Sequence, residues 1–125
     1  MDIFFHVGLG KTGSTYLQHK FFPKLKGIHY IHHTDYKKSI EIISREKHDR
    51  YFVSREFDRQ FLKEIKKFSA VYPDTHPIMV LRRQDSWVAS QYRRFTKNGR
   101  GIYFKEFVDI EHNKGRWDIA EMNFY

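Results

Sequence analysis

The chain has 125 residues, which is enough for one domain. Lys and Arg number 23 against 15 Asp and Glu, and the resulting net charge of +8 favours an anionic partner such as nucleic acid, a phosphorylated cofactor or a sulfated glycan. The hydrophobic content of 40% excludes bulk disorder, and the absence of cysteine excludes disulfides and thiolate chemistry.

Short apolar strands alternate with amphipathic helices along the chain. Strands are predicted at 2–7, 28–33, 50–54 and 77–82. Helices are predicted at 15–22, 36–47, 58–68 and 85–97, with a short one near 103–110 and another beginning near Trp117. This alternation predicts an α/β fold, a parallel sheet flanked by helices in a P-loop-like three-layer αβα arrangement.

Several helix boundaries have their own signals. Thr15 and Gln18 have capping-box spacing, and Asp58 is placed to cap the helix that follows it. In the helix at 85–97, the inward-facing residues are expected to be Trp87, Val88, Tyr92 and Phe95. Asn98–Gly99 is a natural stop for that helix.

The chain ends in a helix-like pattern, RWDIAEMNFY, that has no terminal cap or polar tail. Residues 1–125 are therefore expected to form one cofactor-binding domain that is incomplete at its C-terminus. No apolar run approaches the roughly 18 residues of a membrane span. No basic region precedes the apolar start, as it would in a signal peptide, so a cytoplasmic location is expected.

A glycine-rich turn, His6 to Gln18, lies between the first strand and the first helix. The unpaired N–H groups at the start of a helix, together with its dipole, attract anions. Glycines allow the backbone to approach an oxyanion closely. Lys11 adds a positive charge, and the hydroxyls of Ser14 and Thr15 add donors, so this turn is predicted to hold a phosphate or sulfate group.

Two kinds of phosphate-binding turn compete for this segment. The nucleotide-triphosphate pattern GxxxxGK[ST] places its first glycine at position 5, which is Phe5 inside the strand, so that match fails. The run Lys11-Thr12-Gly13-Ser14-Thr15-Tyr16-Leu17 instead resembles the 5′-phosphosulfate loop of sulfotransferases, PKxGTTxL, with Gly10 where many members have proline. His6-Val7-Gly8 also looks like bacterial and carbohydrate-type members.

A second motif follows the predicted strand at 77–82. Sulfotransferases carry an arginine at a strand end and a serine eight positions later, which together hold the 3′-phosphate of the cofactor. Arg82 and Ser90 have this spacing, with Arg83-Gln84 in place of the usual Asn-Pro. A guanidinium is a forked, permanently charged donor suited to phosphate. Arg82 and Ser90 are therefore predicted cofactor-binding residues.

The resemblance covers residues 3–22 and 77–98. It implies an enzyme that uses 3′-phosphoadenosine-5′-phosphosulfate (PAPS), leaves adenosine 3′,5′-bisphosphate (PAP), and sulfates a hydroxyl or amine of a small-molecule or carbohydrate acceptor. The family's cofactor-binding residues map to Gly10, Lys11, Thr12, Gly13, Ser14, Thr15, Arg82 and Ser90. The family's C-terminal segment rich in glycine and lysine is not found before Tyr125, so the activity of this chain by itself is an open point.

Lys11 is the predicted catalytic cation, which stabilises charge on the leaving oxygen. Glu56 is the predicted base, in a Ser54-Arg55-Glu56 run like the Ser-x-Glu of bacterial members; a surface ion pair with Arg55 or Arg59 is the alternative. His29, His32 and His33 are weaker candidates for the base, and His6 is expected to pack in the strand or orient the loop.

No metal is expected. His32 and His33 with His29 and Asp35 could imitate a metal site, but consecutive histidines on a strand point to opposite faces. Two other functions are kept open: a P-loop kinase or other nucleotide-triphosphate enzyme, and a non-catalytic module that binds polyanions. A truncated domain that binds the cofactor without catalysis is a further alternative. If the chain is a sulfotransferase, nucleic acid is not its expected partner.

Overall fold

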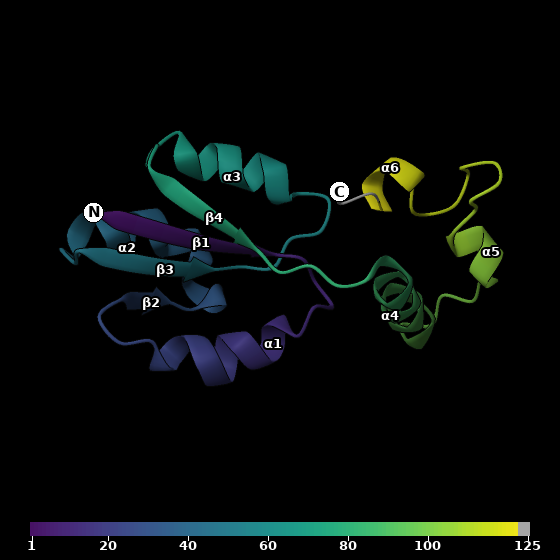
Figure 1. Ribbon diagram of the computed structural model, residues 1–125, viewed down its shortest axis with the longest axis horizontal. Coiled ribbons are helices and arrows are strands. Elements are labelled where there is room, and N and C mark those ends of the chain that lie inside the picture. Colours follow the sequence, from purple (N-terminus) through teal and green to yellow (C-terminus); the bar gives the residue numbers. More distant parts are fainter. Residues whose placement is uncertain (123–125) are drawn as a thin grey trace. The chain divides into compact units, whose positions relative to one another are not determined.

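The computed structural model describes residues 1–122. The chain divides into two compact units, Met1–Val80 and Leu81–Tyr125. Figure 1 shows the strands in the first unit and the longest helix in the second. The division falls between the two sulfotransferase-like motifs, and the expectation that residues 1–125 form a single domain stays a prediction.

A four-stranded sheet forms the centre of the first unit. Its strands are β1 (Asp2–Gly8), β2 (His29–Ile31), β3 (Arg50–Ser54) and β4 (Thr75–Met79). The strand order is β2-β3-β1-β4, and all three pairings are parallel. The predicted α/β fold with a parallel sheet is confirmed.

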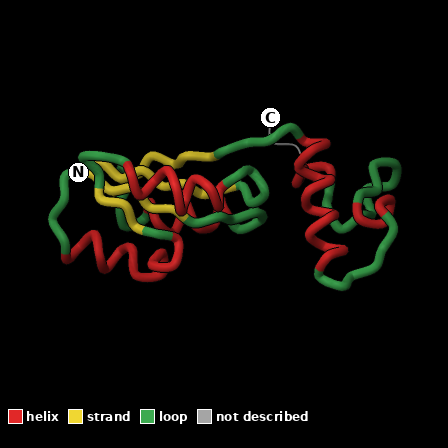
Figure 2. The backbone as a smooth tube through the Cα atoms, turned by 90° about the horizontal axis from the view of Figure 1, so that it is seen from below, coloured by secondary structure: helices red, strands yellow, loops and turns green. Residues whose placement is uncertain are grey.

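Helices cover both faces of this sheet (Figures 1 and 2). One side has a continuous helical segment made of α1 (Ser14–Tyr16), the π-helical η1 (Leu17–Phe21) and the 3-10 turn η2 (Phe22–Lys24). The other side has η3 (His33–Lys38), α2 (Ser39–Arg45) and α3 (Phe61–Ser69). The unit therefore has the three layers that the alternating pattern predicted.

The face under α2 and α3 is apolar. Ile3, Phe5 and Val7 of β1 alternate toward it, as a strand period of two requires. They pack in one buried cluster with Ile31, Ile43, Tyr51, Val53 and Phe68. The Phe5 and Phe68 ring centroids are 4.9 Å apart, so α3 is anchored to the middle of β1.

Strand β4 differs from its prediction. It begins at Thr75 and ends at Met79, whereas residues 77–82 were predicted. β4 is an edge strand, where a proline such as Pro77 is tolerated because only one side of the strand must be paired. The register with β1 shifts between His6 and Gly8, and regular pairing stops at Met79. Arg82 consequently follows the strand and does not end it, which corrects the earlier placement.

The second unit has a small aromatic core of its own. Its helices are α4 (Gln84–Lys97), α5 (Phe104–Phe107) and α6 (Ile119–Met122). Trp87 and Val88 of α4 are buried with Phe107, Val108 and Trp117, and Tyr92 and Phe95 pack against this cluster. The predicted inward face of α4 and its stop at Asn98–Gly99 are confirmed. Residues 123–125 of the predicted last helix lie outside the described residues.

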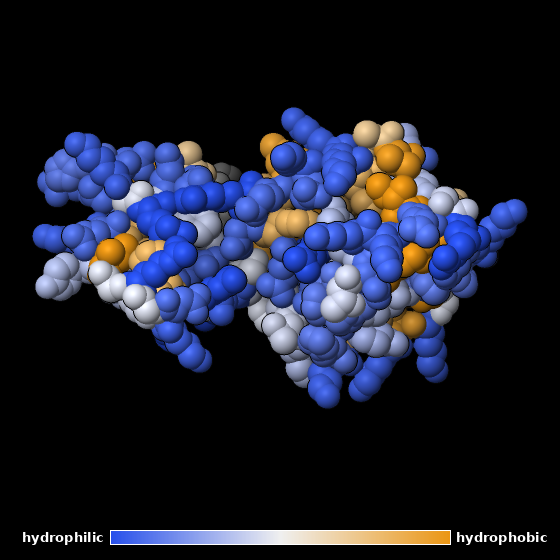
Figure 3. Space-filling model, turned by 180° about the vertical axis from the view of Figure 1, so that it is seen from behind, coloured by the Kyte–Doolittle hydropathy of each residue, from blue (hydrophilic) through white to orange (hydrophobic). Residues whose placement is uncertain are grey.

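Figure 3 shows a largely hydrophilic surface with scattered apolar spots, in keeping with the strongly charged composition. Within residues 1–122, no helix is both long enough and apolar enough to cross a membrane.

Candidate functional site

The turn after β1 lies at the point where the order of the strands in the sheet reverses. The connection from β1 leads to β2 and β3 on one side, and the connection from β3 crosses back over β1 to β4. Ligands of open parallel sheets bind outside the carboxyl ends of the strands at such a point. Gly8 and Leu9 also exchange hydrogen bonds with Val80, at 2.8 and 3.2 Å, so β4 borders the same turn.

The backbone of the turn is tightly wound. Lys11 has a left-handed φ of 65° and Gly13 a φ of 83°, a region that non-glycine residues seldom occupy. Thr12 Oγ1 and Ser14 Oγ both donate to the carbonyl of Leu9, at 2.5 and 3.2 Å, and lie 3.1 Å from each other. These two predicted phosphate donors therefore hold the turn together from inside.

The helix after the turn begins one residue earlier than predicted. Its N-cap is Gly13, without a side-chain hydrogen bond, so the expected capping box of Thr15 and Gln18 is wrong. Thr15 is exposed on the first turn. The Gln18 side chain is buried, and it donates to Ser54 on β3 and not to the helix start.

Asp58 closes against the turn from the segment after β3. Its Oδ1 accepts a hydrogen bond from the backbone N–H of Gly10 at 3.1 Å. It does not cap α3, whose N-cap is Gln60, so the predicted helix-capping role is wrong. A Cβ on Gly10 would lie 3.0 Å from the same carboxylate oxygen. The Gly10 N–H in the turn thus already binds an anionic oxygen, that of the Asp58 carboxylate.

A buried polar cluster lies directly under the turn. Ser54 Oγ is 2.9 Å from His6 Nδ1 and accepts from Gln18 Nε2 at 3.0 Å, which ties β1, β3 and the first helix together. Burial lowers the pKa of His6 to about 4, so the imidazole is neutral at pH 7. Tyr30 donates to the Gln18 carbonyl at 3.1 Å, and burial raises the pKa of Tyr30 to about 12.

Glu56, the predicted base, is half-buried beside β1. Its neighbours extend the strand pairing, because Arg55 N donates to the His6 carbonyl and Phe57 N to the Val7 carbonyl, both at 2.9 Å. A Cβ on Gly8 would lie 2.7 Å from the Phe57 carbonyl oxygen, so this segment passes as close to the turn as glycine allows. Glu56 is therefore held by its backbone at the same sheet edge as Lys11.

The second predicted half of the site belongs to the second unit. Arg82 is exposed in the segment before α4, and Ser90 is half-buried on α4. The next arginine, Arg83, forms a forked pair with Asp85, with both N–O distances at 2.7 Å. Because Lys11 and Arg82 lie in different units, their approach to one nucleotide stays a prediction.

The histidines that follow β2 do not obey strand alternation. β2 ends at Ile31, and His33 begins η3, so His32 and His33 lie outside the strand. Their ring centroids are 4.0 Å apart. The argument that these two rings point to opposite faces is therefore wrong.

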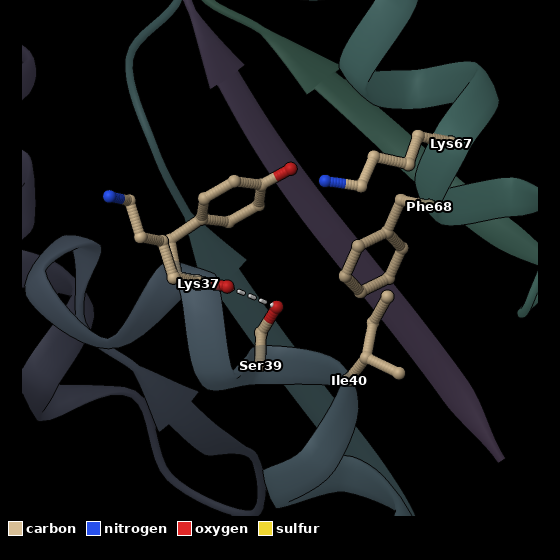
Figure 4. A pocket seen from close by; sticks show the side chains of 6 residues that line it. Lys37, Ser39, Ile40, Lys67 and Phe68 are labelled. Carbon is tan, nitrogen blue, oxygen red and sulfur yellow. Dashed lines mark hydrogen bonds between the residues drawn. The ribbon is translucent and has the colours of Figure 1, made fainter.

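A pocket of about 330 Å³ lies between the η3–α2 segment and α3. Lys67 and Phe68 face Lys37, Ser39 and Ile40 across it (Figure 4). Ser39 Oγ donates to the Tyr36 carbonyl at 2.6 Å, so this hydroxyl stabilises the start of α2. None of the lining residues belongs to the predicted cofactor site.

The chain matches no known family model, no curated protein and no solved structure. Its function therefore has to be argued from its own residues.

Sequence reasoning missed two members of this region. Asp58 and Gln18 were interpreted as helix caps, and both act across the fold, each spanning a long stretch of sequence to reach its partner. Ser54 was noticed only as part of the Ser-x-Glu run. No local signal marks such contacts, because the partners are more than 30 residues apart.

Proposed function

We propose that this chain is the cofactor-binding part of a sulfotransferase, which transfers a sulfuryl group from PAPS to a hydroxyl or amine acceptor. The proposal depends above all on the turn from Gly8 to Thr15, at the carboxyl end of β1. It is tightly wound at Lys11 and Gly13, and the Gly10 N–H already donates to a carboxylate oxygen. A donor of this kind suits the 5′-phosphate of a nucleotide.

The cofactor, when bound, supplies an activated sulfuryl group on a bridging oxygen. Lys11 is assigned to neutralise charge on that oxygen as its bond to sulfur breaks. Gly10, Thr12, Gly13, Ser14 and Thr15 are assigned to the 5′-phosphate through their backbone N–H groups, because the Thr12 and Ser14 hydroxyls already donate to the Leu9 carbonyl. The acceptor's oxygen or nitrogen would form the new bond to sulfur as the bond from sulfur to the bridging oxygen breaks, and Glu56 would take the acceptor's proton.

Arg82 and Ser90 are assigned to the 3′-phosphate, on the sequence motif. Arg82 follows Val80 by two residues along the chain, and Val80 bonds to Gly8 and Leu9. The 3′-phosphate is what distinguishes PAP from AMP, so these two residues carry the specificity of the proposal.

Nucleotide preference tests the proposal. The full chain is titrated with PAP, with ATP and magnesium, and with AMP, while the melting temperature is followed. PAP should give the largest rise, since a ligand that binds only the folded state stabilises it. Lys11→Ala and Arg82→Ala should remove most of this rise. Lys63→Ala, which removes an exposed positive charge on α3, is the matched control and should keep it.

Each remaining outcome favours another function. An equal or larger response to ATP with magnesium would indicate a kinase-like or other nucleotide-triphosphate enzyme. Salt-sensitive binding of heparin or DNA, with no preference for PAP, would indicate a polyanion-binding module. Binding of PAP without sulfation of any hydroxyl or amine acceptor would indicate a cofactor-binding domain that lacks activity by itself.

The position of Asp58 gives a sharper test of the same turn. Its carboxylate lies on Gly10 N–H, so it repels a bound phosphate and competes for one of the donors. Asp58→Asn should therefore tighten PAP binding severalfold, as measured by calorimetry. Glu41→Gln removes an exposed negative charge on α2 and is the control. Unchanged or weaker binding in Asp58→Asn, with the fold intact, would contradict the assignment of the turn.

A further inference from the structure

Three histidines from two segments meet beside the end of β2. His19 lies on η1, whereas His32 and His33 lie at the start of η3. The His19 ring centroid is 5.0 Å from that of His32 and 5.4 Å from that of His33. One ring nitrogen from each of the three lies within 4.8 Å of the other two.

We propose that His19, His32 and His33 form a binding site for a divalent transition-metal ion, and that Zn²⁺ is the ion they suit best. Imidazole is a preferred ligand of zinc, and three histidines leave a fourth tetrahedral position for water or another ligand. At Zn–N distances of about 2.0–2.1 Å, tetrahedral ligand atoms are about 3.4 Å apart. The nitrogens thus need to approach one another by at most about 1.4 Å, which requires rotation of the exposed His19 side chain together with a small adjustment of the His32 and His33 rings.

The strongest support comes from His33. Its Nδ1 atom is buried, and no hydrogen-bond partner reaches it within the described residues. Buried polar atoms in folded proteins are nearly always paired, so this nitrogen calls for a partner. Burial first, and then the neighbouring His32, His19 and Arg55, lower the pKa of His33 against a smaller opposing effect of Asp35. This lowering favours the neutral imidazole, which is the form that binds a metal.

His32 is held by hydrogen bonds to its neighbour Thr34. Its Nδ1 lies 3.0 Å from Thr34 Oγ1, which fits an Nδ1–H that donates to the hydroxyl. That tautomer carries its lone pair on Nε2, the nitrogen then available to an ion. The longer approach of Thr34 N to the same Nδ1, at 3.4 Å, belongs to the other tautomer. Zinc binding should favour the first of these two arrangements.

A second group of possible ligands, His29, Glu46 and His48, provides an internal comparison. There the Glu46 carboxylate already lies 3.5 Å from His29 Nε2 and 3.7 Å from His48 Nε2. Arg45 also donates to Glu46 at 3.1 Å. The Glu46 carboxylate thus already contacts both histidines of this group without a metal, whereas within residues 1–122 no ion pair joins a carboxylate to the three imidazoles of the first group.

Metal titration of the full chain tests the proposal. After dialysis against EDTA, the protein is titrated with ZnCl₂ in a calorimeter, and with Co²⁺ while the visible absorption of tetrahedral cobalt is followed. One site per chain is expected, with no response to Mg²⁺. His19→Ala should weaken zinc binding by more than tenfold and remove the cobalt band. The His19 side chain is exposed, so this variant should keep the melting temperature of the metal-free protein.

Two control variants decide between the histidine groups. His48→Ala disrupts the second group, and His112→Ala removes an exposed histidine of the second unit. Both should bind zinc within twofold of the unaltered chain. His32→Gln should weaken binding as His19→Ala does, which repeats the test at a second ligand. Zinc affinity that is unchanged in both ligand variants, or lost in His48→Ala alone, would overturn the proposal.

Discussion

The two faces of the sheet differ in chemistry, since one is apolar and the other combines aromatic rings with buried polar groups. Toward α2 and α3, β1 presents Ile3, Phe5 and Val7 to an apolar cluster. Toward α1, the same strand presents His6, which is buried against Ser54 and near Phe22. The face toward α2 and α3 is stabilised by apolar burial, whereas part of the interior on the α1 side consists of hydrogen-bonded groups that fix the turn. Stability and site positioning are thus separated by the alternation of a single strand.

The largest expected effect is on the apolar face. Phe5→Ala removes a fully buried ring that packs on Phe68, and should lower the free energy of unfolding by about 3–5 kcal/mol. Urea denaturation measures it. Phe21→Ala, whose side chain is 52% exposed, is the control and should change stability by no more than about 0.5 kcal/mol. Similar losses in the two variants would mean that the apolar face does not dominate stability.

On the polar face, His6 predicts a dependence on pH. Burial lowers its pKa in the folded state to about 4, from 6.5. Between these values the unfolded chain binds a proton and the folded chain does not, so stability is lost as the pH falls from 6.5 toward 4. The loss should reach roughly 3 kcal/mol, at about 1.4 kcal/mol per pH unit.

A comparison of the unaltered chain with the His6→Asn variant separates the contribution of His6 to the pH dependence from that of the other histidines. His6→Asn should be less stable at pH 7, and its stability should fall less steeply below pH 6.5, the ordinary pKa of the group it lacks. Urea denaturation at intervals across this range measures both slopes. Parallel curves for the two proteins would show that His6 is not the titrating group.

The smallest expected effect concerns the hydroxyl that joins the polar cluster. Ser54→Ala leaves His6 Nδ1 and Gln18 Nε2 without their shared partner. The cost should be about 1–3 kcal/mol, since buried polar groups lose their hydrogen bonds. Ser44→Ala removes an exposed hydroxyl that donates to the Glu41 carbonyl at 2.8 Å, and should be nearly neutral. A neutral Ser54→Ala would imply that the cluster contributes nothing to the polar face.

Local patterns were reliable where burial and periodicity agree. Strand β3 was predicted at 50–54 and spans Arg50–Ser54, because a run of apolar residues bounded by polar ones has few other folded states. Helix α4 was predicted at 85–97 and spans Gln84–Lys97, since its apolar stripe and the Asn98–Gly99 stop are both local. Similar reasoning found the glycine-rich turn and its place after a strand.

Prediction failed where a partner distant in sequence decides the outcome. β4 was displaced toward its N-terminus because pairing with β1, not its own apolar run, sets where it begins and ends. Asp58 and Gln18 have the composition of helix caps, yet the turn and β3 offered them better partners. Strand alternation misplaced His32 and His33 because β2 is only three residues long.

Composition and spacing were thus sufficient to identify the layer architecture, the parallel sheet and the turn with Lys11, since these depend on short-range periodicity and on glycine at special backbone angles. Only the tertiary structure revealed that His6, Ser54 and Gln18 share one buried hydrogen-bonded cluster, and that His19 meets His32 and His33. Such contacts depend on how the helices pack against the sheet, and the local sequence around each residue does not encode that packing.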